Sequence, residues 1–180
     1  MKTQWQLAAS LWICVLSPGI SSALLSQVPD APRATSRQLA LEARRVPKPG
    51  SLCDLAQPRR PNQLTFAPGA RVTVRGCTDL DSLQVTAVWI TVRNRDTVTT
   101  LAIELPPPES VTVGTSRGAS RAVALWIAAG GQPGFATEVS GISTTLKPGA
   151  TLELLYLVPS AVPGSRLTIG GYGTVQLRPN

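Results

Sequence analysis

The side chains that could do acid–base or metal chemistry here are carboxylates, because the chain has no histidine. The absence of histidine excludes a Ser-His-Asp or Cys-His mechanism and any His-ligated metal site within this chain. Asp79 and Asp81 lie two positions apart, and Asp54 comes near them only if a disulfide joins Cys53 to Cys77. Three converging carboxylates would offer Ca²⁺ its oxygen ligands, whereas aspartate is also common in solvated turns. We favour the turn interpretation and predict no metal site.

The glutamates offer no acid–base pair. Glu104, Glu109, Glu138 and Glu153 each fall on an expected polar strand face or in a loop, where carboxylates are usually solvated. The glycine-rich stretch 130–141 contains GGQPG, which matches neither a dinucleotide-binding nor a P-loop pattern, and no helix pattern follows it. We interpret this stretch as a connection. The sequence therefore predicts a protein that is not an enzyme, with no catalytic residues and no cofactor.

Two cysteines remain once an expected export signal is removed. The chain has three cysteines, and Cys14 lies inside the apolar leader described below. Cys53 and Cys77 form an even pair, which in an oxidising compartment predicts a disulfide bond. A bond across this 24-residue separation would stabilise the fold by about 3–4 kcal/mol in the chain-entropy model. The alternatives are a two-thiolate metal site or reactive thiols, which have neither histidine nor further cysteines nearby.

Positive charge is concentrated in the first third of the expected mature chain. The whole chain has 17 basic and 10 acidic residues, and residues 24–75 carry nine basic and three acidic ones. One interpretation is a surface for a polyanion such as nucleic acid, an anionic glycan or a lipid surface. The other is a solvated, flexible lead-in, because the arginine doublets lack interleaved aromatic residues for base stacking. The residues that would bind the polyanion are Arg44, Arg45, Lys48, Arg59, Arg60, Arg71 and Arg75.

Trp89 and Trp126 are the candidates for an interaction platform. Each lies in the middle of an expected strand, on the face opposite the residues expected in the core. If both are exposed on one sheet, they form a flat platform for a sugar ring or a protein partner. If that face is covered, for example by the N-terminal segment, they are ordinary core residues. The apolar neighbours Ala87, Ala122 and Ala124 favour the covered alternative.

Residues 1–23 have the pattern of an export signal. Lys2 supplies a short positive region, residues 7–16 an apolar core, and Ser21 and Ala23 the small residues that a signal peptidase accepts. The apolar core has ten residues, whereas a membrane-spanning helix needs about 20. An uncleaved N-terminal anchor is the alternative. No other apolar run is long enough to span a membrane, so we predict a secreted, periplasmic or envelope-located protein without a membrane span after cleavage.

The elements that must position these residues are β-strands. Alternating apolar residues bounded by turn residues are typical of half-buried strands. The run 83–94 is apolar on both faces, with Val88, Ile90 and Val92 sharing one of them, so we expect this strand to be central. The expected strands are 64–66, 71–74, 83–94, 98–105, 110–113, 121–128, 151–158 and 167–177, the last kinked at its glycines.

The connections follow from turn residues and prolines. Pro68 and Gly69 predict a turn between the first two strands, and residues 94–96 predict a hairpin turn into 98–105. Residues 106–108 are three prolines, which lack ladder donors and must cross an edge or carry the chain between sheets.

The segment 38–46 is ambiguous. Thr35 and Gln38 fit a capping box for a short helix, whereas the apolar residues of 38–46 alternate as in a strand. We favour the strand, because everything downstream has strand patterns.

About seven or eight short strands, frequent turns and no amphipathic helix favour an antiparallel β-sandwich. We expect residues 1–23 to be a signal peptide, 24–51 a basic, proline-rich segment or linker, and 52–180 the β-sandwich domain. We also expect a monomeric or weakly associating protein.

One resemblance rests on the segment 89–94, which reads WITVRN. It resembles the V-x-V-x-N strand of small secreted bacterial domains with an immunoglobulin-like sandwich, a family of largely unknown function. Such domains continue with a Leu-x-Pro-Gly segment, an apolar strand and a Val-Pro pair, which correspond here to 146–149, 152–157 and 158–159. The basic N-terminal segment, the three prolines and the cysteine pair depart from that pattern. The resemblance implies an antiparallel immunoglobulin-like β-sandwich and export, and carries over no catalytic residue.

These observations predict a non-enzymatic exported β-sandwich, acting as a binding or accessory module of the cell envelope or extracellular space. Its partner would be a protein or an envelope component. The alternative is a polyanion-binding protein that acts through its basic N-terminal third.

Overall fold

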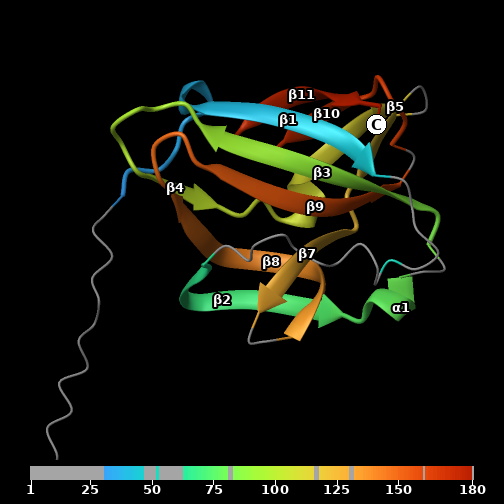
Figure 1. The fold of residues 1–180 in the computed structure, drawn as a ribbon. Coiled ribbons are helices and arrows are strands. Elements are labelled where there is room, and N and C mark those ends of the chain that lie inside the picture. The colour runs from blue at the N-terminus through green and yellow to red at the C-terminus, as the bar shows by residue number, and fades with distance from the viewer. Residues whose placement is uncertain are drawn as a thin grey trace, which may run out of the picture.

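The protein folds into a curled β-sheet with very little helix (Figure 1). The computed structural model describes residues 31–46, 52, 63–80, 83–115, 118–129, 132–159 and 161–179. The short helical elements are η1 (Ser36–Gln38), α1 (Cys77–Leu80) and η3 (Pro108–Ser110). The strands are β1 (Leu39–Val46), β2 (Thr65–Arg75), β3 (Val85–Asn94), β4 (Leu101–Glu104), β5 (Val111–Thr115), β6 (Gly118–Arg121), β7 (Ala124–Ala129), β8 (Gln132–Leu146), β9 (Thr151–Pro159), β10 (Arg166–Ile169) and β11 (Gly173–Arg178). The predicted all-β fold is confirmed.

The strands are hydrogen-bonded in the order β2-β8-β7-β9-β3-β1-β11-β10-β5-β6, and β4 pairs with β8. The paired strands run antiparallel, except that β1 and β11 run parallel through Ala43–Leu177 and Arg44–Arg178. The parallel contact joins the two halves of the order into one mixed sheet, where the sequence predicts antiparallel pairing throughout.

The main core lies inside the curl of the sheet. The core contains Val88, Ile90 and Val92 of β3. It also contains apolar residues of the other strands, such as Ile142 of β8 and Leu167 of β10. All five side chains are at most 1% exposed. The predicted core face of β3 is confirmed, and so is its central position, because β1 and β9 pair with its two edges.

A second apolar cluster covers the other face of β3, β7 and β9. It contains Leu52, Leu80, Ala87, Phe135, Leu155 and Leu157 among its buried residues, with Trp89 and Trp126 packed against it. Leu52 is 0% exposed and Leu80 of α1 is 4% exposed. The strands at the centre of the sheet are therefore apolar on both faces because both faces are covered.

Strand β1 belongs to the sheet, although the sequence analysis assigns residues 24–51 to a basic linker. It pairs along its whole length with β3, from Leu39–Asn94 to Val46–Ala87. The predicted strand at 38–46 and the alternative capping box both form, because Gln38 closes η1 on Thr35 and the strand begins at the next residue. The ordered fold thus includes a strand well before Leu52.

Several predicted turns and connections are wrong, the turn at Pro68 and Gly69 among them, because β2 runs through it from Thr65 to Arg75. Strand β4 pairs with β8 rather than forming a hairpin with β3. Most of the predicted connection 130–141 is strand, within β8. The predicted kinked strand at 167–177 is the hairpin β10–β11, which turns where the Tyr172 N–H donates to the carbonyl of Ile169.

Glycines explain why the sequence predicts a turn at 68–69 and a connection at 130–141, where the structure has the strands β2 and β8. Gly69 has a φ of +81° and lies in a bulge, because the β2–β8 register jumps between Phe66 and Arg71. Gly134 lies where a Cβ would collide with the side chain of Val74 on β2. These glycines mark a bulge and a close approach of strands rather than the ends of strands.

The three prolines carry the chain between two halves of one sheet, rather than between separate sheets. They lead from β4, which pairs with β8, through η3 to β5, which pairs with β10 and β6. The leader 1–23 lies outside the described residues. In the part of the chain that is described, no helix is long and apolar enough to cross a membrane.

Gly170→Ala tests the close packing of this second half. A Cβ at position 170 would lie 2.8 Å from the Cβ of Ser110 and 3.3 Å from its carbonyl oxygen. We expect the substitution to lower the free energy of unfolding by about 1–3 kcal/mol. Gly114→Ala is the matched control, because its added Cβ would meet only a carbonyl oxygen at 3.9 Å. Urea unfolding of both variants makes the comparison, and equal stabilities would contradict the packing.

Candidate functional site

The predicted polyanion-binding residues do not form one patch in the described structure. Arg44 and Arg45 are exposed on β1, whereas Arg71 and Arg75 are exposed on β2, at one end of the strand order. In Figure 1, β1 and β2 lie at opposite sides of the molecule. The remaining three predicted residues, Lys48, Arg59 and Arg60, lie outside the described residues.

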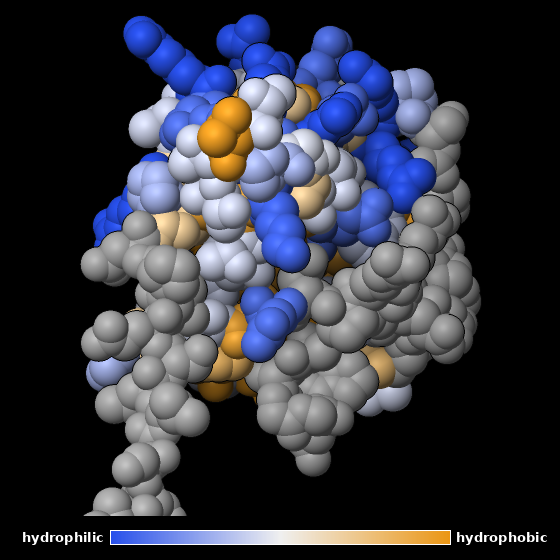
Figure 2. Space-filling view, turned by 60° about the vertical axis from the view of Figure 1, so that its left-hand side comes forward, coloured by the Kyte–Doolittle hydropathy of each residue, from blue (hydrophilic) through white to orange (hydrophobic). Residues whose placement is uncertain are grey.

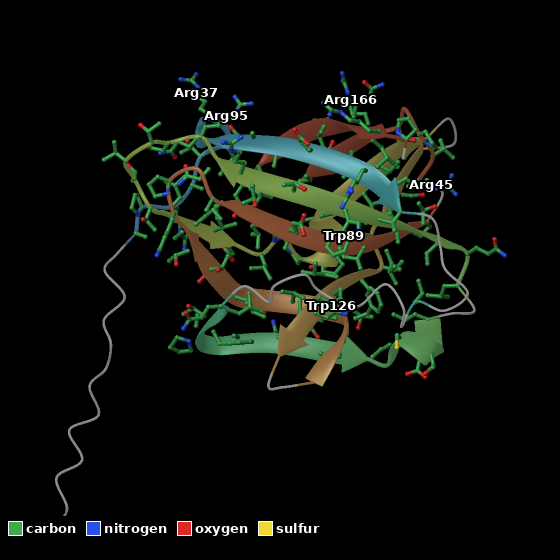
Figure 3. All side chains as sticks on the ribbon, in the orientation of Figure 1. Arg37, Arg45, Trp89, Arg95, Trp126 and Arg166 are labelled. Atoms are coloured by element: carbon green, nitrogen blue, oxygen red, sulfur yellow. The ribbon has the colours of Figure 1, made fainter. Side chains whose placement is uncertain are left out.

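The fold instead gathers arginines that are distant in the sequence. Arg37 lies in η1, and Arg95 follows the end of β3. The two are held close because the Arg95 N–H donates to the carbonyl of Gln38 at 2.8 Å. Figure 3 shows the two side chains beside each other on the outside of the fold. Arg93 is exposed two residues earlier in the same segment.

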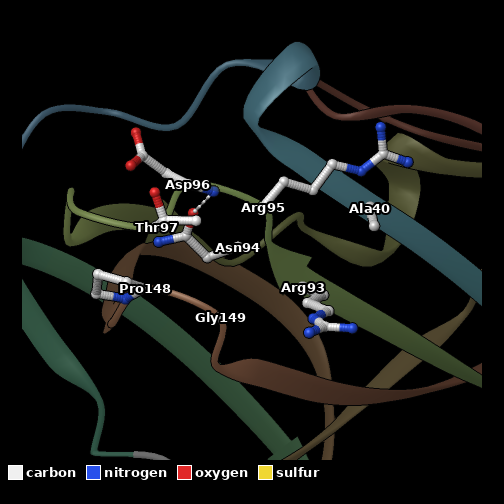
Figure 4. Close-up of a pocket in the computed structure, with 8 residues that line it drawn as sticks. All are labelled: Ala40, Arg93, Asn94, Arg95, Asp96, Thr97, Pro148 and Gly149. Carbon is white, nitrogen blue, oxygen red and sulfur yellow. Dashed lines mark hydrogen bonds between the residues drawn. The ribbon is translucent and has the colours of Figure 1, made fainter.

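Arg93 and Arg95 border a surface hollow at the end of β3 (Figure 4). Its volume is about 520 Å³. Arg93, Arg95 and Ala40 lie on one side of it, and Asp96 with Thr97 on the other (Figure 4). The residues that line the hollow are Ala40, Arg93, Asn94, Arg95, Asp96, Thr97, Pro148 and Gly149.

Asn94 forms the rigid base of this site. Its side chain is 0% exposed, and its Nδ2 donates to the carbonyls of Thr99 at 2.8 Å and Leu146 at 3.0 Å. Its Oδ1 accepts the N–H of Asp96, and its own N–H donates to the carbonyl of Ala150. One residue thus ties β3 to the segment that follows it and to the β8–β9 connection.

Asp96 is the carboxylate of the hollow, and it is already used by the backbone. Its Oδ1 accepts the N–H groups of Val98 at 2.8 Å and Thr99 at 2.9 Å. These bonds, the one from Val98 first, hold the pKa of the Asp96 carboxyl below its usual value. The group is therefore an anion at neutral pH, and it orders the loop that carries the hollow's far wall.

A second hollow lies farther along β1, and Glu42 is part of its lining. Arg44 and Arg178 are partners in the parallel β1–β11 ladder and line this hollow together with Glu42 and Glu153. Its volume is about 720 Å³. Two arginines at paired positions repel each other, and neither forms an ion pair with the carboxylates of this hollow.

Most cations of the described residues have no carboxylate partner among them. The ion pair is Arg71 Nε with Glu138 Oε1 at 3.8 Å, between exposed side chains of β2 and β8. In Figure 2, strongly hydrophilic side chains gather over the upper part of the molecule, where Figure 1 has β1, β10 and β11. Arg37, Arg95 and Arg166 lie together on the side opposite β2 (Figure 3), and none of them has an ion pair among the described residues; Arg75 on β2 is unpaired as well.

Trp89 and Trp126 lie together on the second apolar cluster. Both side chains are half-buried and pack against a cluster that includes Leu52 and Leu80. In Figure 3, Trp89 of β3 lies above Trp126 of β7. The Nε1 of Trp126 is buried without a hydrogen-bond partner in the described part of the chain. The covered face agrees with the alternative in which the two tryptophans are ordinary core residues. An exposed interaction platform stays a prediction.

The described carboxylates form no cluster of three, although Glu42 and Glu153 line one hollow. Within the described ranges, no group of three or more cysteine, aspartate or glutamate residues is arranged to hold a metal ion. Asp79 is exposed on α1, and Asp54 and Asp81 lie outside the described residues. Cys77 packs against the second cluster, and Cys53 lies outside the described residues, so the disulfide stays a prediction.

Two buried tyrosines hydrogen-bond backbone carbonyls through their hydroxyl groups. Tyr156 is 0% exposed and donates its hydroxyl to the carbonyl of Pro106 at 2.6 Å, and Tyr172 donates to the carbonyl of Glu104 at 2.7 Å. Burial raises the pKa of both phenols, that of Tyr156 well above its usual value. A raised folded-state pKa contributes stability that is present below about pH 10 and is lost as the pH rises further.

We therefore expect urea unfolding to show a marked fall in stability between neutral pH and about pH 11. Tyr156→Phe should lose about 1–3 kcal/mol at neutral pH, because the carbonyl of Pro106 loses its donor. It should also weaken the alkaline loss. An alkaline profile identical to that of the unmodified protein would contradict the assignment to Tyr156.

No protein family model, curated protein or solved structure matches this chain at a significant level. The resemblance to secreted bacterial immunoglobulin-like domains therefore remains a prediction. Sequence reasoning missed the hollow beside Arg93 and Arg95. Its one visible signal was the alternation R-N-R at 93–95, which places two arginines on one side of a buried asparagine.

Proposed function

We propose that the protein is a non-enzymatic, exported binding or accessory module of the cell envelope or extracellular space. The two hollows combine arginines with carboxylates, Arg93 and Arg95 with Asp96 in the first and Arg44 and Arg178 with Glu42 and Glu153 in the second. The leader pattern at 1–23 and the V-x-V-x-N resemblance support export and an immunoglobulin-like sandwich. The stable double-sided core supports a role as a rigid scaffold for surface contacts.

The observation that carries a binding role is the surface of unpaired arginines on the side opposite β2. Arginine presents a planar fork of donors that suits carboxylate, sulfate and phosphate groups. Arginines without carboxylate partners add nothing to the stability of the fold, whereas their positive field attracts anions. An anionic polymer is therefore the partner that this surface favours, and a neutral protein or envelope component is the second candidate.

Capture of partners by mature protein purified from the culture medium or envelope fraction tests the role. We expect an anionic polymer among the captured material, released by added salt. For three charge contacts, raising salt fourfold should weaken binding roughly 40-fold, by the counterion-release slope for duplex DNA. Binding that is insensitive to salt would point to the neutral partner. Turnover of a captured polymer would contradict a non-enzymatic role.

A further inference from the structure

The hollow at the end of β3 has the donors of an anion site. Arg93 and Arg95 line it, and Arg37 lies beside Arg95. None of the three has a carboxylate within ion-pair distance among the described residues, where the ion pair is Arg71–Glu138. Exposed guanidinium groups that are not neutralised by the protein are available to a ligand.

The backbone that carries these arginines is held in place before any ligand binds. Asn94, between Arg93 and Arg95, is fully buried and bonded to both neighbouring connections. The Arg95 N–H is bonded to Gln38, which fixes η1 and Arg37 against the same end of the strand. A site on a fixed backbone loses less conformational entropy on binding than one on a mobile tail.

The far wall of the hollow favours a ligand with hydroxyl groups. Asp96 and Thr97 offer a carboxylate and a hydroxyl opposite the arginines. A carboxylate accepts hydrogen bonds from sugar hydroxyls, and the sugar–phosphate backbone of DNA has no such donors. No aromatic side chain lines the hollow for base stacking. A ligand that carries both anionic groups and hydroxyl donors satisfies both walls.

We propose that this hollow binds an acidic polysaccharide, with Arg93 and Arg95 holding a sulfate or carboxylate group and Asp96 and Thr97 accepting hydroxyl groups of the same sugar or its neighbour. Arg37 contacts the next anionic group along the chain. The proposal rests on the proposed function, which makes the protein an exported binding module, and names its ligand class and its site.

The test measures the affinity of the mature protein for heparin, a polyuronate, duplex DNA and anionic phosphatidylglycerol vesicles by calorimetry. The site variant is Arg93→Gln with Arg95→Gln, and the matched control is Arg75→Gln with Arg121→Gln. The control removes the same charge from exposed residues of β2 and β6. All four arginines are exposed, so thermal unfolding should be nearly unchanged in both variants.

We expect the site variant to weaken binding to at least one of the two polysaccharides by about tenfold or more, and the control by less than about threefold. Equal weakening by both variants would overturn the site and leave a general charge effect. DNA or vesicles bound as tightly as the polysaccharides would overturn the ligand class. Failure to bind any of the four probes would overturn this proposal alone, because partner capture tests the module's broader role separately.

Discussion

Replacing Asn94 with aspartate is expected to lower the free energy of unfolding by about 3–5 kcal/mol. The substitution keeps the shape of the side chain and replaces only its Nδ2 donor with an oxygen. The carbonyls of Thr99 and Leu146 would then face an acceptor instead of a donor, and the Leu146 contact is buried. Each carbonyl left without a donor lowers the free energy of unfolding by about 1–3 kcal/mol, and the unpaired charge of the introduced aspartate lowers it further.

Urea unfolding at neutral pH measures the loss. Gln176→Glu is the matched control, because it makes the same change from amide to acid at an exposed position of β11 opposite Arg166. The control should stay within about 0.5 kcal/mol of the unmodified protein. If the Asn94→Asp variant is as stable as the control, Asn94 does not anchor the end of β3.

The anchoring also has a consequence for binding. The side chain of Asn94 holds the segment that leads to Asp96 and the loop of the hollow's far wall. A variant that folds but loosens this end should therefore bind acidic polysaccharide more weakly, although every arginine is still present. A double effect on stability and affinity is what distinguishes a positioning residue from a purely structural one.

Loss of the predicted Cys53–Cys77 disulfide is expected to cost about 3–4 kcal/mol, from the chain entropy of a 24-residue separation. The structure adds a reason to expect this bond. Leu52, the residue before Cys53, is 0% exposed in the cluster against which Cys77 packs. Cys77 and the residue that precedes Cys53 therefore meet the same apolar cluster.

Intact mass with and without reductant detects the bond, and urea unfolding of Cys77→Ala measures its contribution. Acrylamide quenching adds a local measurement, because Trp89 and Trp126 pack against the same cluster. We expect reduction to make these tryptophans more accessible. Leu52→Ala is the comparison that keeps both cysteines and loses about 2–5 kcal/mol of packing. Free thiols in the exported protein would contradict the prediction.

Alternation was sufficient to predict the centre of the sheet. In β3 both faces are mainly apolar from Val85 to Val92, and a strand that is covered on both faces is stable in the middle of a sheet. The same signal predicts β9 at 151–158, one residue short of its observed end. It also predicts that the tryptophans lie opposite the main core, as Trp89 does in the second cluster.

Pairing partners and the arginine site could not be predicted in the same way. Glycine and proline in β8 look like loop residues, although Gly134 is needed because Val74 of β2 approaches its backbone. Residues 94–96 have the pattern of a hairpin turn. In the structure, however, the buried Asn94 side chain donates to the carbonyl of Leu146, and the strand that follows, β4, pairs with β8. Arg37 and Arg95 meet only because β1 pairs with β3, which no local pattern reveals.

Nuclear magnetic resonance of arginine side-chain N–H groups during titration with heparin fragments tests the central claim most directly. We expect the signals of Arg93 and Arg95 to shift first and saturate together, while those of Arg71 and Arg75 on β2 stay in place. Shifts that begin on β2, or equal shifts at all exposed arginines, would contradict a binding site at the end of β3.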